Sequence, residues 1–309
     1  MTDAFQPLPA SRMISMAGHV GSGKTTVARL ICERTGRELF STGRVFRELA
    51  QRLGMTVLQL NEYALTHPEV DAEVDGHLRR LAEQPRPLVI DSRMAFFFVP
   101  TSYKVYLVVD PEVGGARVYR AGRHDESYRS ITAAEVEGKA RERVEANRYY
   151  DLYGVVRDDW RNYDLVVDTT SAPPDLVADT VLSTNDQHPS NDRPRCFLCP
   201  NRLLPSRMPL AADAPGGREA STARIDVMVA AGHMVVVDGH RGVAAALAEG
   251  LPLIECHLAG FEDQPGRDGR SAREFAAATL SEPTLQAWES KYGLSYGPRP
   301  PWINESTST

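Results

Sequence analysis

Gly18-His19-Val20-Gly21-Ser22-Gly23-Lys24-Thr25 matches in full the pattern G-x-x-x-x-G-K-[ST] of a phosphate-binding P-loop. An apolar run at 13–17 predicts a buried strand before this loop, and helix-forming residues at 25–34 predict a helix after it. Such a loop directs backbone N–H groups and the positive end of a helix dipole at phosphate. We therefore predict a nucleotide site formed by Gly18, His19, Val20, Gly21, Ser22, Gly23, Lys24, Thr25 and Thr26. A glycine-rich turn that binds no ligand is the alternative.

Three side chains in or near this loop have specific predicted roles. Lys24 would reach the β- and γ-phosphates of ATP, and the hydroxyl of Thr25 would ligate Mg²⁺. Asp91 ends a predicted strand and could hold the same ion through water or cap the next turn, and we favour the metal. ATP and Mg²⁺ are therefore the predicted cofactors.

Short apolar runs at 38–41, 87–91, 104–110 and 163–168 alternate with stretches of helical spacing. Strands that alternate with helices and are apolar throughout predict an α/β domain with a parallel sheet covered on both faces. Ligands of such sheets bind at the carboxyl ends of the strands, where the P-loop and Asp91 fall.

The whole-chain properties set the number of domains and the class of protein. With 309 residues, 42% of them hydrophobic, the chain is long enough for two cores. We predict a tail at 1–11, a first domain at 12–184, a linker at 185–195 and a second domain at 196–309. The net charge of −6 argues against a general nucleic-acid binder, so DNA is not an expected partner. The start does not resemble a signal peptide and no apolar run could span a membrane, which predicts a cytoplasmic protein.

Arginines are concentrated around the predicted phosphate site. Arg44 and Arg47 follow the second strand, and Arg93 follows the third. The long helical stretch at 111–150 carries Arg117, Arg120, Arg123, Arg141, Arg143 and Arg148. Each arginine taken alone could be an ordinary surface residue. As a set they indicate cations that close over a transferring phosphoryl group and a second substrate that bears phosphate.

Residues 12–184 resemble the archaeal-type cytidylate kinases, a family of nucleoside-monophosphate kinases. The matching segments are the P-loop and residues 41–50, 61–64, 67–71, 91–93, 147–154 and 163–169. The resemblance implies ATP as donor and CMP or dCMP as acceptor. It implies that the acceptor lies near Ser41, Arg44, Arg47, Asp91, Arg93 and Arg143. It implies catalytic roles for Lys24, Arg93, Arg120, Arg123 and Arg148, with Arg120, Arg123, Arg143 and Arg148 in the lid region.

Two features depart from the family pattern. Ser92 stands where the family has a glycine, which could alter the approach of the backbone to the acceptor. Residues 94–100 are unusually aromatic and could pack against a substituted base, or they could be plain core.

The second domain carries a C-x-x-C at Cys196 and Cys199. A structural zinc site needs four ligands, and Cys256 and His257 could supply the other two. We favour two reduced structural thiols.

Further along, residues 225–231 predict a short helix and 234–238 a buried strand. The turn Gly239-His240-Arg241 leads into a helix, Gly250 ends that helix, and a strand follows at 253–258. Residues 200–262 thereby resemble the ParB/sulfiredoxin-like nucleotide-binding fold. The resemblance implies a smaller α+β domain that could take a second nucleotide or phosphate at Gly239, His240 and Arg241. A small domain without a ligand is the alternative.

The favoured function is ATP- and Mg²⁺-dependent phosphoryl transfer to a pyrimidine nucleoside monophosphate, with a ParB-like module attached. One alternative is a kinase for a modified pyrimidine nucleotide or another small acceptor. The other is a non-enzymatic regulator gated by nucleotide.

Overall fold

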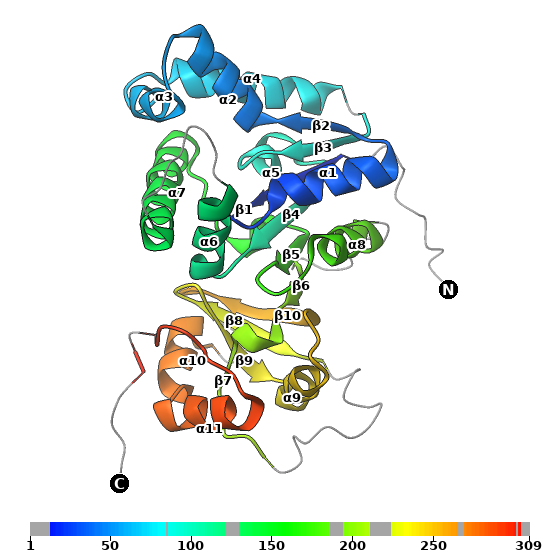
Figure 1. Ribbon diagram of the computed structural model, residues 1–309, viewed down its shortest axis with the longest axis vertical. Coiled ribbons are helices and arrows are strands. Elements are labelled where there is room, and N and C mark those ends of the chain that lie inside the picture. The colour runs from blue at the N-terminus through cyan, green and yellow to red at the C-terminus, as the bar shows by residue number, and fades with distance from the viewer. Residues whose placement is uncertain are drawn as a thin grey trace. The chain divides into compact units, whose positions relative to one another are not determined.

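The computed structural model describes residues 13–84, 86–121, 130–185, 194–210, 224–264, 269–300 and 302–303. The chain divides into two compact units, Met1–Asp192 and Arg193–Thr309 (Figure 1). The elements of the first unit are β1 (Ile14–Gly18), α1 (Lys24–Thr35), β2 (Glu38–Ser41), α2 (Thr42–Arg52), α3 (Val57–Tyr63), α4 (Glu69–Glu83), β3 (Leu88–Asp91), α5 (Ala95–Phe98), β4 (Tyr103–Val108), α6 (Pro111–Ala121), α7 (Ile131–Tyr153), η1 (Trp160–Asn162), β5 (Leu165–Asp168) and α8 (Pro174–Asn185). Those of the second are β6 (Arg195–Leu198), η2 (Pro200–Arg202), β7 (Leu203–Pro205), β8 (Asp226–Ala230), β9 (His233–Asp238), α9 (His240–Glu249), β10 (Ile254–Phe261), α10 (Ala272–Thr279) and α11 (Glu282–Tyr292).

The sheet of the first unit has the strand order β2-β3-β1-β4-β5, and all its pairings are parallel. This confirms the predicted α/β class and the five predicted strands. β1 is buried along its whole length between β3 and β4, which explains its continuous apolar sequence. Helices α1 and α8 pack against each other (Figure 1). Because the strand order reverses at β1, the loop after β1 opens where ligands of such sheets bind.

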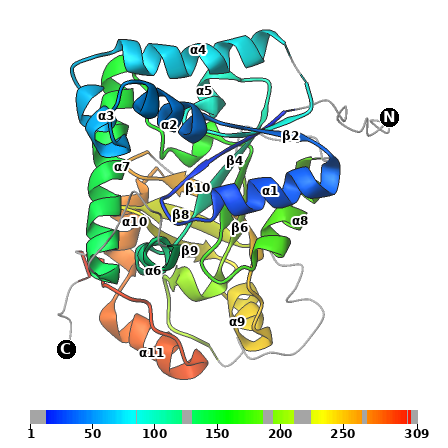
Figure 2. The same cartoon turned by 45° about the horizontal axis from the view of Figure 1, so that its top comes forward.

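The helical stretch predicted at 111–150 forms two helices that pack side by side, α6 and α7 (Figure 2). Residues 122–129 between them lie outside the described residues. A Cβ added at Gly115 would lie 2.9 Å from the Cβ of Glu135, so a glycine is required where the two helices touch.

The aromatic run at 96–98 divides between core and surface. Phe96 is buried against Tyr163, with ring centroids 4.9 Å apart, as the core interpretation predicts. Phe97 is 41% exposed, and Phe98 lies beneath the guanidinium of Arg79. Of the three Phe rings only that of Phe96 is in the core, and the other two face α4 and α7 or solvent. Elsewhere in residues 94–100, Met94, Ala95 and Val99 are buried as well.

Two buried carboxylates of α4 meet the end of α7. Asp71 pairs with Arg148, whose Nε lies 3.3 Å from its Oδ2, and Asp75 accepts a hydrogen bond from the hydroxyl of Tyr153. Burial raises the pKa of Asp75 from 3.8 to about 6, and Asp71 adds to this effect, whereas the Tyr153 hydrogen bond opposes it. These contacts join α7 to α4.

Asp75→Asn tests the cost of that buried charge. Because the folded-state pKa of Asp75 lies above its unfolded value, wild type loses stability relative to the variant as the pH rises through about 6. We expect the stability advantage of the variant to grow by about 1–2 kcal/mol between roughly pH 4 and pH 7. Urea unfolding at both pH values measures this change. The exposed Asp151→Asn on α7 is the control, and an equal difference at both pH values would contradict the assignment.

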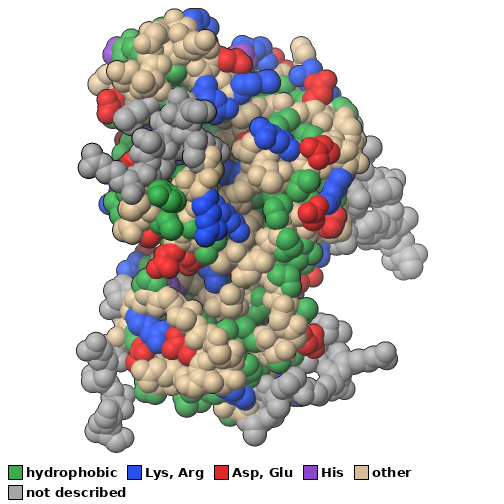
Figure 3. Space-filling model, in the orientation of Figure 1, with side chains coloured by type: hydrophobic (Ala, Val, Ile, Leu, Met, Phe, Trp, Pro, Cys, Tyr) green, Lys and Arg blue, Asp and Glu red, His purple; other side chains and the backbone are tan. Residues whose placement is uncertain are grey.

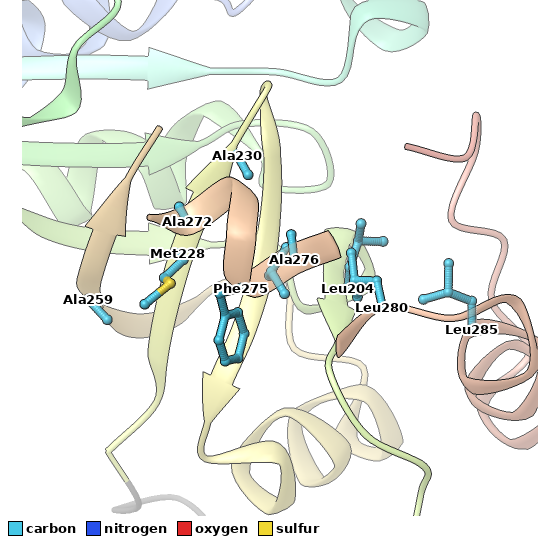
Figure 4. Close-up of a cluster of buried hydrophobic side chains, with 10 residues drawn as sticks. Leu204, Met228, Ala230, Ala259, Ala272, Phe275, Ala276, Leu280 and Leu285 are labelled. Carbon is cyan, nitrogen blue, oxygen red and sulfur yellow. The ribbon is translucent and has the colours of Figure 1, made fainter. Parts of the chain in front are cut away.

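The sheet of the second unit has the strand order β6-β10-β8-β9-β7. β6 and β10 are antiparallel, as are β8 and β9, whereas β8 is parallel to β10 and β7 is parallel to β9. A core formed by side chains from β7, β8, β9, β10, α10 and α11 covers one part of this sheet (Figure 4). Two helices, α10 and α11, follow β10.

The prediction of a helix at 225–231 is wrong. These residues form β8, which pairs with β9 in an antiparallel hairpin. Ala231 and Gly232, with φ of +45° and +79°, make the tight turn between the two strands. The cross-strand hydrogen bonds of the hairpin outweigh the weak helical preference of Met228 and Ala230.

The cysteines of the second unit are buried free thiols. Cys196 on β6 lies directly opposite Cys256 on β10, and both are buried, as is Cys199. His257 is exposed on the other face of β10. Among the described residues, no three His, Cys, Asp or Glu side chains are grouped so that they could hold a metal ion. The described geometry therefore does not bring the four candidate zinc ligands together.

Most of the predicted linker at 185–195 lies outside the described residues, although Asn185 still belongs to α8 and Arg195 already belongs to β6. The predicted tail at 1–11 also lies outside them. None of the described helices combines the length and the apolar character that crossing a bilayer requires.

Candidate active site at the P-loop

The P-loop connects β1 to α1, as the sequence predicts, and its glycines are required by the geometry. Gly18 has φ +141°, and a Cβ added there would lie 2.1 Å from the carbonyl oxygen of Leu107 on β4. Gly21 has φ +75°, and its Cβ would lie 2.3 Å from the carbonyl oxygen of Gly114 on α6. Both positions therefore exclude any side chain, and the loop packs backbone against backbone.

Lys24 lies inside the curve of this loop. Its Nζ donates hydrogen bonds to the carbonyl oxygens of Gly18 at 2.7 Å and His19 at 2.6 Å. Burial lowers the pKa of Lys24 from 10.5 to about 7, and the positive charge of Arg93 lowers it further, whereas Asp91 and Glu142 oppose this shift. The carboxylates of the protein thus balance the positive charge of Lys24 only in part. A bound anionic phosphate would supply further negative charge beside it.

Thr25, in the first turn of α1, and Asp91, the last residue of β3, lie side by side. The hydroxyl of Thr25 donates a hydrogen bond of 2.8 Å to Oδ2 of Asp91. Hydroxyl and carboxylate oxygens are the ligands that Mg²⁺ prefers, so this pair fits the predicted magnesium site. A magnesium ion that also binds nucleotide phosphates and waters needs no larger cluster of protein ligands.

Asp91→Asn tests this assignment. We expect the Mg²⁺ concentration that gives half-maximal phosphoryl transfer to rise about tenfold, because a carboxylate that orients the ion or its waters is lost. Titration of activity with Mg²⁺ after removal of metal by a chelator measures the change. Asp179→Asn, which alters an exposed carboxylate on α8, should leave the titration unchanged. An unaltered titration in Asp91→Asn would exclude Asp91 from the metal site.

The tip of the P-loop contacts α7 through a carboxylate. The backbone N–H of Val20 donates a hydrogen bond to Oε1 of Glu142. A cavity of about 90 Å³ lies beside this contact, between the P-loop, α6 and α7. Burial lowers the pKa of His19, against the opposing charge of Glu142, and its ring packs edge-on against Tyr106. A protein carboxylate thus interacts with a P-loop amide.

The remaining predicted P-loop residues have distinct positions. The hydroxyl of Ser22 is turned inward and donates to the carbonyl oxygen of His19 at 2.8 Å, so it braces the loop. Gly23 begins α1 in the left-handed conformation with φ +80°, and Thr26 is exposed on the first turn of that helix.

The residues predicted near the acceptor lie on the elements that follow β2 and β3. Ser41 ends β2 and precedes α2, whose exposed face carries Arg44 and Arg47. Arg44 forms only a loose pair with Glu48, at 3.7 Å. In the space-filling view, Lys and Arg side chains gather on the face of the first unit that carries α2 and α6 (Figure 3). This face can receive a second anionic substrate.

The predicted lid arginines differ in their surroundings. Arg120 on α6 and Arg143 on α7 are exposed, whereas Arg148 is largely buried against Asp71. Arg123 lies outside the described residues. The described structure therefore brings Arg148 to α4 and leaves Arg120 and Arg143 at the surface.

The side chains of Ser92 and Arg93, which follow β3, make different contacts. The Ser92 hydroxyl accepts a hydrogen bond from the N–H of Met94 at 3.3 Å, and Ser92 is buried, so its side chain folds back into the protein. Arg93, which is 20% exposed, forms an ion pair with Glu145 of α7.

The structure adds four residues that the sequence patterns did not indicate as parts of this site. Glu142 and Glu145 are spaced by three on α7 and therefore share one face of the helix. Arg157 and Asp158 lie beyond the end of α7 and pair with each other at 2.8 Å. The i, i+3 spacing of Glu142 and Glu145 is a sequence signal that could have been noticed, whereas nothing in the sequence marks Arg157.

In the second unit, the three residues of the predicted anion site have different surroundings. Gly239 precedes α9 with φ +84°, and its Cβ would lie 2.5 Å from the carbonyl oxygen of Arg224. His240 is buried, and its Nε2 accepts a hydrogen bond from the N–H of Ser206 at 3.2 Å. Arg241 is exposed at the start of the helix. His240 thus ties β7 to α9, and Arg241 is the candidate side chain at the surface.

A parallel sheet with its P-loop at the switch point, a lysine within that loop and a Thr–Asp pair beside it define a P-loop nucleotide-binding protein. Residues 14–140 match a family model described as an AAA domain. The chain is 35% identical over 170 residues to a cytidylate kinase of Archaeoglobus fulgidus. The aligned region covers 55% of this chain and 92% of that protein. Over its N-terminal unit the chain belongs to the cytidylate kinase family, which confirms the resemblance predicted there.

Other relatives match a similar share of the chain. A cytidylate kinase of Methanobrevibacter smithii is 31% identical over 172 residues, which are 56% of this chain and 97% of that protein. An S-adenosylmethionine-dependent nucleotide dehydratase of Lacinutrix mariniflava is 32% identical over 170 residues, 55% of this chain but 35% of that protein. A shikimate kinase structure from Bacteroides thetaiotaomicron superposes with a TM-score of 0.40 at 14% identity, covering 56% of this chain and 95% of that one. The ParB-like resemblance of residues 200–262 stays a prediction.

Proposed function

We propose that the first unit transfers the γ-phosphoryl group of ATP to a pyrimidine nucleoside monophosphate, with CMP or dCMP preferred. The observation that carries this proposal is the joint placement of Lys24, the Thr25–Asp91 pair and Arg93 at the ends of β1 and β3. The family to which the unit belongs, with cytidylate kinases among the relatives, supports the choice of acceptor.

In the proposed reaction, an anionic oxygen of the acceptor phosphate forms a bond to the γ-phosphorus of ATP. The bond between that phosphorus and the β,γ-bridging oxygen breaks, and ADP leaves with the electron pair. The backbone of the P-loop and Lys24 hold the β- and γ-phosphates, and Arg47 and Arg93 present the acceptor in line. Thr25 and Asp91 would hold Mg²⁺, which would neutralise developing charge on the phosphates when bound.

The deciding experiment gives the full-length protein ATP, Mg²⁺ and a panel of nucleoside monophosphates, and separates the products by chromatography. CDP or dCDP formation that is absent in Lys24→Ala supports the proposal. Phosphorylation of substituted pyrimidine nucleotides alone would favour the alternative acceptor, for which the exposed ring of Phe97 beside Tyr153 is the structural reason. ATP binding without transfer to any acceptor would favour a nucleotide-gated regulator.

For the second unit, we propose a phosphate-bearing ligand at the start of α9. The left-handed Gly239, the exposed Arg241 and the N-terminus of a ten-residue helix support this choice. Arg241→Ala should weaken the binding of nucleotide to this unit in a Lys24→Ala background, where the first unit no longer contributes the P-loop lysine. Calorimetric titration measures the loss. The two-domain division at 12–184 and 196–309 and the cytoplasmic location also remain predictions.

A further inference from the structure

α7 carries a buried carboxylate, Glu145, between two arginines that come from different parts of the chain. Arg93 follows β3, and Arg157 lies beyond the end of α7. Glu145 forms an ion pair with Arg93, and Nη1 of Arg157 lies 3.6 Å from its Oε2. The side chain of Glu145 is 7% exposed and that of Arg157 only 2%, so little solvent reaches this pairing. A buried carboxylate requires such partners, because an uncompensated charge is costly there.

A series of different contacts leads from Arg157 to the P-loop. Arg157 pairs with Asp158 at 2.8 Å, and the hydroxyl of Tyr106 donates to the same carboxylate at 2.8 Å. The ring of Tyr106 in turn packs edge-on against His19, with centroids 5.6 Å apart. A contiguous set of contacts therefore runs from Arg93 to the P-loop, and Glu145 is the member that touches Arg93.

We propose that Glu145 is a positioning residue for Arg93, which it holds in the orientation that receives the acceptor phosphate. This inference rests on the proposed function, in which Arg93 binds that phosphate. A free arginine side chain loses much rotamer freedom when it grips a ligand. An ion pair formed in the folded protein removes that loss from the binding step, so the acceptor meets a preorganised guanidinium. Arg157, which also pairs with Asp158, helps to hold the carboxylate of Glu145 in place beside Arg93.

Glu145→Gln in the full-length protein tests the proposal through steady-state kinetics. We expect KM for the acceptor monophosphate to rise about 10- to 100-fold, because Arg93 is no longer held, while KM for ATP changes less than about twofold. Glu137→Gln, on the exposed face of the same helix, is the matched control and should leave both constants unchanged. Equal changes in the two constants for Glu145→Gln would overturn the proposal.

A double-mutant cycle separates positioning from a purely structural role. If Glu145 acts through Arg93, adding Glu145→Gln to Arg93→Ala should change the acceptor KM no further. If Glu145 only neutralises Arg157, the two substitutions should act independently and their effects should multiply. The second result would overturn the proposal.

Glu145→Asp is the variant to measure if Glu145→Gln does not fold. It keeps the negative charge beside Arg157, but its shorter side chain moves the carboxylate away from Arg93. The KM of Glu145→Asp for the acceptor should lie between that of wild type and that of Glu145→Gln. If Glu145→Gln cannot be measured, the KM of Glu145→Asp should still exceed that of wild type. An acceptor KM equal to that of wild type would overturn the proposal. If wild type phosphorylates no monophosphate, the proposed function is wrong and so is this inference. If wild type is active, the kinetics of the Glu145 variants test this inference alone.

Discussion

Lys24→Ala is expected to lower kcat for phosphoryl transfer about 10³-fold. The substitution removes the cation that lies within the P-loop, where charge develops on the transferring group. The fold should persist, because the ammonium group donates to loop carbonyl oxygens and to the hydroxyl of Ser22 rather than to the core. Initial rates with ATP, Mg²⁺ and CMP measure the loss.

The matched control for this prediction is Lys291→Ala. Lys291 lies on the surface of the second unit, where its Nζ donates to the carbonyl oxygen of Leu210. This variant should retain the full rate, and both variants should show the thermal unfolding of wild type. A Lys24→Ala protein that is folded and still transfers phosphate at the normal rate would remove the P-loop lysine from the proposed chemistry.

Gly18→Ala is expected to cost about 4 kcal/mol or more in the free energy of unfolding of the first unit. The left-handed φ of +141° strains any L-residue, and the added methyl carbon would lie 2.1 Å from the carbonyl oxygen of Leu107. The clash is with backbone of the neighbouring strand β4, so no side chain can rotate to relieve it. Denaturant unfolding of the full-length protein measures the cost.

Gly36→Ala separates the clash from the effect of the dihedral angle. Gly36 ends α1 with φ +69°, but a Cβ there would meet no atom within 4 Å. This variant should therefore lose only about 1–2 kcal/mol, the cost of the left-handed conformation. Equal losses in the two variants would show that steric contact with β4 does not contribute.

The fold of the first unit could be predicted because its signals are local and agree with one another. A strand, a P-loop and a helix follow each other directly, and the buried parallel strands are apolar on both faces. The sequence predicts β9 but not β8 as a strand, because β8 contains Met and Ala, which favour helix when read alone. Its strand character depends on pairing with β9, which a single segment does not reveal.

The site could be predicted as far as its motifs extend. The P-loop residues and the proximity of Thr25 and Asp91 follow from strand order and spacing. The pairing of Arg93 with Glu145 joins residues 52 positions apart, and that of Arg148 with Asp71 joins residues 77 apart. Such pairs depend on how α7 packs, and helical periodicity alone does not fix the partners of an arginine.

The contact between Val20 and Glu142 affects how the measured affinity of this chain for a nucleotide is interpreted. The P-loop amide already holds a carboxylate, so a phosphate that binds there exchanges one anion for another. The binding free energy obtained from a measured dissociation constant is then the difference between two interaction free energies, and it understates how strongly the P-loop attracts negative charge. A phosphate that took the place of Glu142 at this amide would couple nucleotide binding to the contact between the P-loop and α7.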